Sequence, residues 1–109
     1  MPAELSETFA ALGDPVNLAI VRLLLAEPRR SSEIADALEL SRPDASRHLA
    51  TLRRAALVDG HSAPEDARAR VYALRPERFD DLRAFLEEVE AFWSRQLSAF
   101  KAHAEGRTR

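Results

Sequence analysis

The strongest constraint on the fold is a pair of short amphipathic segments that follow each other in the middle of the chain. Their apolar residues recur at the intervals of one helical face: Ile34, Ala35 and Leu38 in the first segment, and Ala45, Leu49 and Leu52 in the second. The two segments meet across a turn at residues 38–41, which is the spacing of a helix-turn-helix. The sequence therefore predicts this unit over about residues 31–55.

Capping residues indicate where the helices begin. Ser41, followed three residues later by Asp44, fits a capping box at the start of the second helix of this unit. Ser31 or Ser32 is expected to cap the first helix. Upstream, Asp14-Pro15 is a pair that caps and opens another helix. The chain before that pair is predicted to form a short first helix.

The rest of the chain predicts a hairpin and a long helix. Two short apolar runs, separated by a polar stretch, predict the strands of a β-hairpin at about residues 57–74. Apolar residues then repeat at steps of three and four from Phe79 to Phe100, which predicts a helix over about residues 77–104. The expected fold is mainly α with a small β-hairpin, in the order α-α-α-α-β-β-α, as one domain over residues 1–109.

Composition excludes several classes of protein. The chain has 109 residues, no cysteine and a formal net charge of −2. The lack of cysteine excludes disulfides, thiolate metal sites and thiol redox sensing. Six arginines and four acidic residues lie between Ser41 and Arg70, whereas both ends of the chain are acidic. No apolar run is long enough to cross a membrane and the first residues lack a signal-peptide pattern, so we expect a cytoplasmic protein.

A helix-turn-helix followed by a hairpin predicts a winged helix-turn-helix that binds DNA. In such a unit the second helix lies in the major groove, where its first residues reach the edges of the bases. Arg42 and Arg47 are the best candidates for base contacts, because arginine can bond both acceptors of guanine. Arg68 and Arg70, on the predicted wing, are placed to contact backbone phosphates.

The chain resembles the ArsR/SmtB family of winged-helix repressors over nearly its whole length. The resemblance rests on the segments FAALGDPVNLAIVRLLL, SSEIADALELSRPDASRHLATLRRAALV and VYAL. It implies a homodimer formed by the first and last helices, with His48 beside the arginines on the DNA-facing helix. The complete DNA-binding prediction comprises Ser41, Arg42, Pro43, Ser46, Arg47, His48, Thr51, Arg54, Arg68 and Arg70. The chain is thus interpreted as a dimeric repressor of its own or a neighbouring operon, bound to double-stranded operator DNA.

The chain departs from the pattern of this family at three places. Val16-Asn17 stands where Thr-Arg usually follows the GDP motif, so any role of that arginine is absent. Glu39 stands at the position in the turn where the family usually has glycine. If this residue has positive φ, glutamate in place of glycine costs on the order of 1 kcal/mol of stability. Glu65-Asp66 at the tip of the wing would repel phosphate, so the arginines at its base are preferred as DNA contacts.

Metal sensing, which occurs in many members of this family, is not supported by the residues present. Residues 30–33 supply no cysteine, and residues 80–82 lack the histidine of the family's other site. The remaining histidines, His48, His61 and His103, are scattered along the chain. We therefore predict a regulator without metal or cofactor, and the effector is unknown. A metal-responsive repressor with a non-standard histidine and carboxylate site is the alternative.

The last helix carries an aromatic stripe that predicts a dimer interface. Its segment WSRQLSAFK is similar to the branch of the family without metal ligands. The predicted interface comprises Leu5, Phe9, Leu82, Phe85, Leu86, Val89, Phe92, Trp93, Leu97 and Phe100. A ligand pocket, or a module that holds another protein, is the alternative for the same stripe. No enzyme is predicted, because Asp80-Asp81 and Glu87-Glu88 diverge on a helix and form no catalytic dyad.

Overall fold

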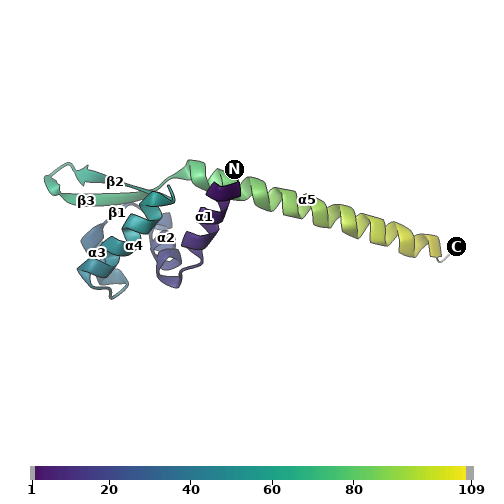
Figure 1. Ribbon diagram of the computed structural model, residues 1–109, viewed down its shortest axis with the longest axis horizontal. Coiled ribbons are helices and arrows are strands. Elements are labelled where there is room, and N and C mark those ends of the chain that lie inside the picture. The colour runs from purple at the N-terminus through teal and green to yellow at the C-terminus, as the bar shows by residue number, and fades with distance from the viewer. Residues whose placement is uncertain (1, 108–109) are drawn as a thin grey trace. The chain divides into compact units, whose positions relative to one another are not determined.

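Helices form most of the chain, together with one small antiparallel sheet (Figure 1). The computed structural model describes residues 2–107, and the side chains of residues 4–106. The elements are α1 (Pro2–Leu12), α2 (Pro15–Ala26), β1 (Arg29–Arg30), α3 (Ser31–Ala37), α4 (Arg42–Arg54), β2 (Val58–Ala63), β3 (Asp66–Leu74) and α5 (Pro76–Arg107). The chain divides after Phe79 into two compact units, the second formed by the greater part of α5. The predicted class, mainly α with a β-hairpin wing, is confirmed.

A buried apolar core holds the first unit together. Ile20 and Leu24 of α2 meet Leu49 and Leu52 of α4 there, and each is at most 4% exposed. Ile34 of α3 is fully buried in the same cluster, so both helices of the helix-turn-helix are anchored to one core. Burying a side chain of this size stabilises the fold by about 1.5–3 kcal/mol. The core thereby sets which face of α4 is turned to solvent.

Side-chain caps begin α2 and α4, as the sequence predicts. Asp14 Oδ1 accepts hydrogen bonds from the N–H groups of Val16 at 2.8 Å and Asn17 at 3.2 Å. Ser41 Oγ accepts a hydrogen bond from the N–H of Asp44 at 3.1 Å. Each cap satisfies backbone donors that the first turn of a helix leaves free.

The start of α3 differs from the prediction. Ser31 and Ser32 do not cap this helix, because both lie inside it and Arg30 precedes it. Arg30 has extended backbone as the last residue of β1, and Glu33 Oε1 accepts a hydrogen bond from its N–H at 2.8 Å. The end of a strand, and not a serine, therefore sets where α3 begins.

Strand β1 is a feature that the sequence did not predict. The sheet has the order β1-β3-β2, and both outer strands run antiparallel to β3. Arg29 is paired with Tyr72, and Arg30 with Val71. A strand of two residues is too short to show the alternation by which strands are recognised. Its pairing ties the start of α3 to the base of the wing.

Two residues other than glycine have positive φ within the described part of the chain, Glu39 at 54° and Ala56 at 61°. Glu39 lies in the turn between α3 and α4. The N–H of Leu40 then bonds the carbonyl oxygen of Ala35 at 2.8 Å and closes the end of α3. Ala56 adopts the same conformation just after α4, and no pattern in the sequence indicated it.

Candidate nucleic-acid interface

Helix α4 presents a polar face rich in arginine. Arg42, Ser46, Arg47 and Arg54 are exposed on it, and Thr51 is half-buried. The apolar residues of the opposite face lie in the core. Donors and cations therefore project outward from a helix whose axis is held by packing, which is what a recognition helix requires. Two further predicted contacts are exposed at the helix start, Ser41 and Pro43.

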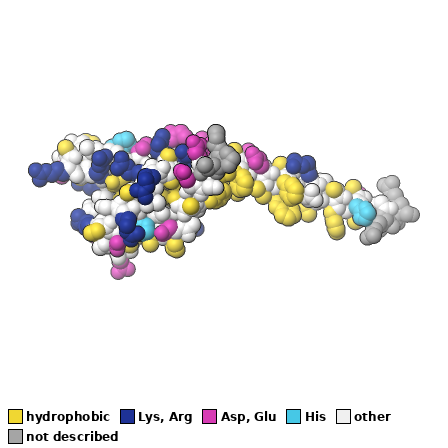
Figure 2. All heavy atoms as spheres, in the orientation of Figure 1, with side chains coloured by type: hydrophobic (Ala, Val, Ile, Leu, Met, Phe, Trp, Pro, Cys, Tyr) yellow, Lys and Arg dark blue, Asp and Glu magenta, His cyan; other side chains and the backbone are white. Residues whose placement is uncertain are grey.

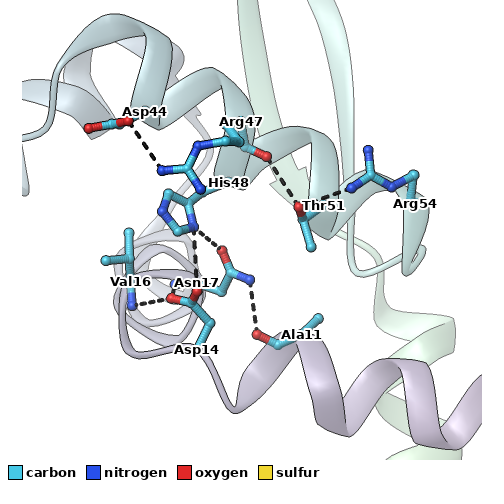
Figure 3. Close-up of polar contacts among 9 residues, drawn as sticks. All are labelled: Ala11, Asp14, Val16, Asn17, Asp44, Arg47, His48, Thr51 and Arg54. Atoms are coloured by element: carbon cyan, nitrogen blue, oxygen red, sulfur yellow. Dashed lines mark hydrogen bonds and ion pairs between the residues drawn. The ribbon is translucent and has the colours of Figure 1, made fainter.

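Arg47 is paired with an acidic residue of its own helix. Its Nη2 lies 3.2 Å from Asp44 Oδ1 (Figure 3). The pKa of the Asp44 carboxyl is lowered, first by this bond and then by the Ser41 hydroxyl. Asp44 therefore stays ionised at neutral pH, and a base that binds Arg47 has to compete with it.

Hydrogen bonds also orient the later residues of this face. The Thr51 hydroxyl donates to the carbonyl oxygen of Arg47 at 3.2 Å. Arg54 Nη2 donates to the same hydroxyl oxygen at 3.2 Å (Figure 3). Arg54 is thus held along α4, where an exposed cation can meet backbone phosphate.

His48 requires a correction, because it does not point outward with the arginines. The residue is only 9% exposed. Its Nδ1 lies 2.8 Å from Asn17 Oδ1 and 3.9 Å from Asp14 Oδ2, both at the start of α2 (Figure 3). The sequence places His48 next to Arg47, but one step along a helix turns a side chain by roughly 100°. Its position therefore suits a contact that orients α4 and not a direct contact with DNA.

Asn17 is a site residue that the sequence analysis missed. It is 2% exposed, and its side chain joins α4 to the end of α1. Nδ2 donates to the carbonyl oxygen of Ala11 at 3.0 Å, while Oδ1 bonds His48. A signal was present, because Asn17 precedes Ile20 and Leu24 by three and seven positions and so shares their buried face.

Asp14 supports the same contact from the first turn of α2. The N–H of Asn17 is the main cause that lowers the pKa of the Asp14 carboxyl, and the N–H of Val16 and the nearby His48 and Arg47 lower it further. Asp14 is therefore a stable anion near the buried imidazole. A helix start with a carboxylate cap is also favoured by the helix dipole.

The wing carries exposed arginines, and its acidic residues are engaged. Arg68 and Arg70 are exposed on β3, and Arg70 Nη1 donates to the carbonyl oxygen of Gly60 at 3.2 Å. Glu65 forms an ion pair with Arg30, and Asp66 Oδ1 accepts a bond from the N–H of Arg68 at 2.9 Å. In Figure 2, basic side chains (dark blue) gather on the part of the first unit that is formed by the wing and α4.

The predicted dimer residues form apolar surface in both units. In α5 the exposed fractions are 57% for Leu86, 46% for Phe92, 57% for Trp93, 65% for Leu97 and 73% for Phe100. Leu82, Phe85 and Val89 are half-buried. In α1, Phe9 is 43% exposed and Leu5 is half-buried. Large exposed apolar surface of this kind marks an interaction site.

The described residues show neither a metal-binding cluster nor a single membrane-spanning helix. They contain no group of three or more histidine and acidic side chains placed to hold a metal ion. No single helix among them is long and apolar enough to cross a membrane, and α1 with α2 meets that test only as a pair bent by 92°.

Comparison with known proteins agrees with this geometry. Residues 14–59 match the family described as "Bacterial regulatory protein, arsR family". The chain is 37% identical over 90 residues to the HTH-type transcriptional regulator Rv2034 of Mycobacterium tuberculosis, which covers 83% of this chain and 78% of that protein. The chain belongs to the ArsR family. It is therefore a DNA-binding transcriptional regulator with a winged helix-turn-helix.

Solved structures of similar proteins have the same fold. An ArsR-like transcriptional regulator from Rhodococcus sp. RHA1 superposes with a TM-score of 0.75 at 29% identity, over 91% of each chain. HlyU from Vibrio cholerae superposes with a TM-score of 0.66 at 27% identity, over 81% of this chain and 92% of that one. The resemblance to this family noted in the sequence is confirmed. Within this ArsR-family member, Asn17 stands where an arginine is usual, and the structure gives it a buried role.

Proposed function

We propose that this ArsR-family protein is a homodimer that binds a pseudo-palindromic operator and represses its own or a neighbouring operon. The observation that carries the proposal is the exposed row of Arg42, Ser46 and Arg47 on a helix anchored to the core. These side chains supply donors at the end of the helix that reaches base edges in this motif. Arg68 and Arg70 would add phosphate contacts from the wing.

The exposed apolar residues support pairing through a second copy of the chain. Trp93, Leu97 and Phe100 are each more than half exposed, and burial stabilises by about 25 cal/mol for each Å² of apolar surface. Aromatic side chains are enriched in the buried cores of such interfaces. A two-fold dimer would bring two recognition helices to half-sites about 34 Å apart on one side of the duplex.

Repression would then follow from occupation of the operator, since a dimer bound at a promoter blocks polymerase. We propose that this protein acts by binding alone, without catalysis and without a metal ion as its signal. Its proposed target is operator DNA, so we expect it to act in the cytoplasm.

The test is selection of bound duplexes from random DNA, followed by fluorescence anisotropy at several salt concentrations. We expect the affinity to fall steeply as salt rises, because neutralised phosphates release counterions. Binding that is independent of salt, or no selected sequence, would reject the proposal. Capture of a different protein in place of DNA would favour an interaction module.

The contributions of two arginines separate base reading from phosphate contact. Arg47→Ala should weaken operator binding by about 1–3 kcal/mol and non-specific binding much less, because a base contact is lost. Arg68→Ala should weaken both by a similar factor, because a phosphate contact carries no sequence information. Arg83→Ala, on the exposed surface of α5, is the control. Equal losses at both sequences for Arg47→Ala would contradict its assignment.

A further inference from the structure

A groove of about 320 Å³ lies where the start of α3, the start of α4 and strand β3 come together. Six residues with hydrogen-bond donors in their side chains line it: Arg30, Ser31, Ser32, Arg42, Arg68 and Arg70. All of them belong to the first unit, so the geometry of the groove is set within one compact body. We call it the phosphate groove.

The charge of the phosphate groove is strongly positive. Its lining includes four arginines, and Asp66 is the one acidic residue among the lining residues. One oxygen of Asp66 already accepts the N–H of Arg68 at 2.9 Å. Arginine guanidinium groups and serine hydroxyls together suit an anion with several acceptor oxygens, and they match the geometry of phosphate.

Glu65, in the turn between β2 and β3, pairs with one of the arginines that line this groove. Its carboxylate forms an ion pair with Arg30 at the end of β1. Both side chains remain accessible, at 36% exposed for Arg30 and 62% for Glu65. An exposed pair of this kind is weak, so another anion can displace the carboxylate.

We propose that the phosphate groove binds a phosphodiester group of the DNA backbone, and that this group displaces Glu65 from Arg30. The inference rests on the proposed function and adds Arg30, Ser31 and Ser32 to its contacts. Glu65 competes with DNA of any sequence, because the ion pair has to break before Arg30 can bind phosphate. This competition lowers the affinity for the DNA backbone and leaves base recognition by α4 unchanged.

Anisotropy measurements with a labelled duplex test the ion pair directly. Glu65→Gln should bind about two- to fivefold tighter than the wild type, since an exposed ion pair no longer competes. Glu88→Gln, which makes the same change of charge on exposed α5, is the matched control and should change affinity less. In the Arg30→Gln background, Glu65→Gln should give no more than the control does.

The salt dependence identifies which residue contacts phosphate. Arg30→Gln should make the slope of log affinity against log salt shallower by about 0.9 for each groove, because one phosphate is no longer neutralised. Glu65→Gln should keep the wild-type slope, because Arg30 binds phosphate in both proteins. Equal effects of Glu65→Gln and Glu88→Gln, or a gain that persists without Arg30, would overturn the proposal.

Titration with inorganic phosphate separates this inference from the proposed function. Amide shifts at Ser31 and Ser32 in nuclear magnetic resonance spectra should respond in the wild type and not in Arg30→Gln. If the protein binds no DNA but these shifts occur, the proposed function fails and the groove is a site for a free phosphate. If they occur while Arg30→Gln leaves the slope for DNA unchanged, the backbone assignment is overturned. If no shift occurs, the groove is not an anion site.

Discussion

Asn17 shows how one buried amide can position a recognition helix. It bonds the carbonyl oxygen of Ala11 with its nitrogen and the His48 ring with its oxygen. The two partners belong to two other helices: Ala11 lies at the end of α1 and His48 in the middle of α4. Removing the amide would cost His48 Nδ1 its 2.8 Å partner and would leave the Ala11 oxygen only its 3.3 Å bond from the N–H of Asp14.

We expect Asn17→Ala to lower the free energy of unfolding by about 1–3 kcal/mol, which is the range for buried polar groups that lose a hydrogen-bond partner. Urea unfolding of the purified protein would measure it. Ser46→Ala, on the exposed face of the same recognition helix, should change stability by less than about 0.5 kcal/mol. Similar small changes in both variants would show that the Asn17 bonds contribute nothing.

The carboxylate of Asp14, which lies beside Asn17, makes the stability of the fold depend on pH. Its pKa is lowered in the folded state, chiefly by the N–H of Asn17. The unfolded chain therefore binds the proton more readily, so the stability from the Asp14 charge is present above the ordinary carboxyl pKa of about 4. It is lost as the pH falls through the lower pKa of the folded protein.

Asp14→Asn isolates this charge, because asparagine can cap the helix but does not titrate. The wild type should be more stable than the variant at neutral pH, and the two should converge as the pH falls below about 4. Thermal unfolding followed by circular dichroism over this pH range provides the comparison. A difference that stays constant with pH would mean that the charge of Asp14 is not responsible.

The turn between α3 and α4 is decided by backbone conformation at Glu39. Its φ of 54° suits glycine, and a Cβ in this region costs about 1–2 kcal/mol. The helix-turn-helix tolerates this cost because the residues on both sides are anchored in the core.

Glu39→Gly should therefore be more stable than Glu39→Ala by up to about 1 kcal/mol. The comparison uses alanine as its control, because alanine removes the carboxylate but retains the Cβ that causes the strain. Unfolding midpoints in urea would rank the two variants. If alanine is as stable as glycine, the positive φ carries no cost in this turn.

The edge strand of the sheet, β1, is an element that could not be predicted from the sequence. Arg29 and Arg30 have no strand pattern of their own, and they become a strand only by pairing with β3. This pairing also gives α3 its start, in place of the serines that the sequence suggested. Caps made by neighbours in the chain, as at Asp14 and Ser41, were predictable because the donor lies two or three residues from the acceptor.

At the scale of the whole molecule, α5 carries exposed apolar side chains that are not part of the core of the first unit. Leu97 is 65% exposed in the single chain, and we propose that a second copy covers it. A charge at this position would have to be buried without a partner in the dimer, which is unfavourable.

Leu97→Glu should raise the dimer dissociation constant at least tenfold and weaken operator binding, because two linked half-sites are no longer bound together. Sedimentation velocity over a range of concentrations would detect the shift to monomer. Leu25→Glu is the matched control, since Leu25 is 69% exposed on α2 and lies outside the predicted interface. The interface assignment fails if both variants dimerise like the wild type.

The sequence by itself determined the helix-turn-helix, the wing, the caps of α2 and α4, the apolar stripe of α5 and the family. These features depend on residues a few positions apart, so periodicity and capping chemistry show them directly. Only the tertiary structure decided the burial of His48, the role of Asn17 and the pairing of Arg30 with Glu65. Asn17 and His48 are separated by 31 positions, and packing of the core brings them within hydrogen-bonding distance. Contacts of this kind arise from how whole elements pack, which no local pattern records.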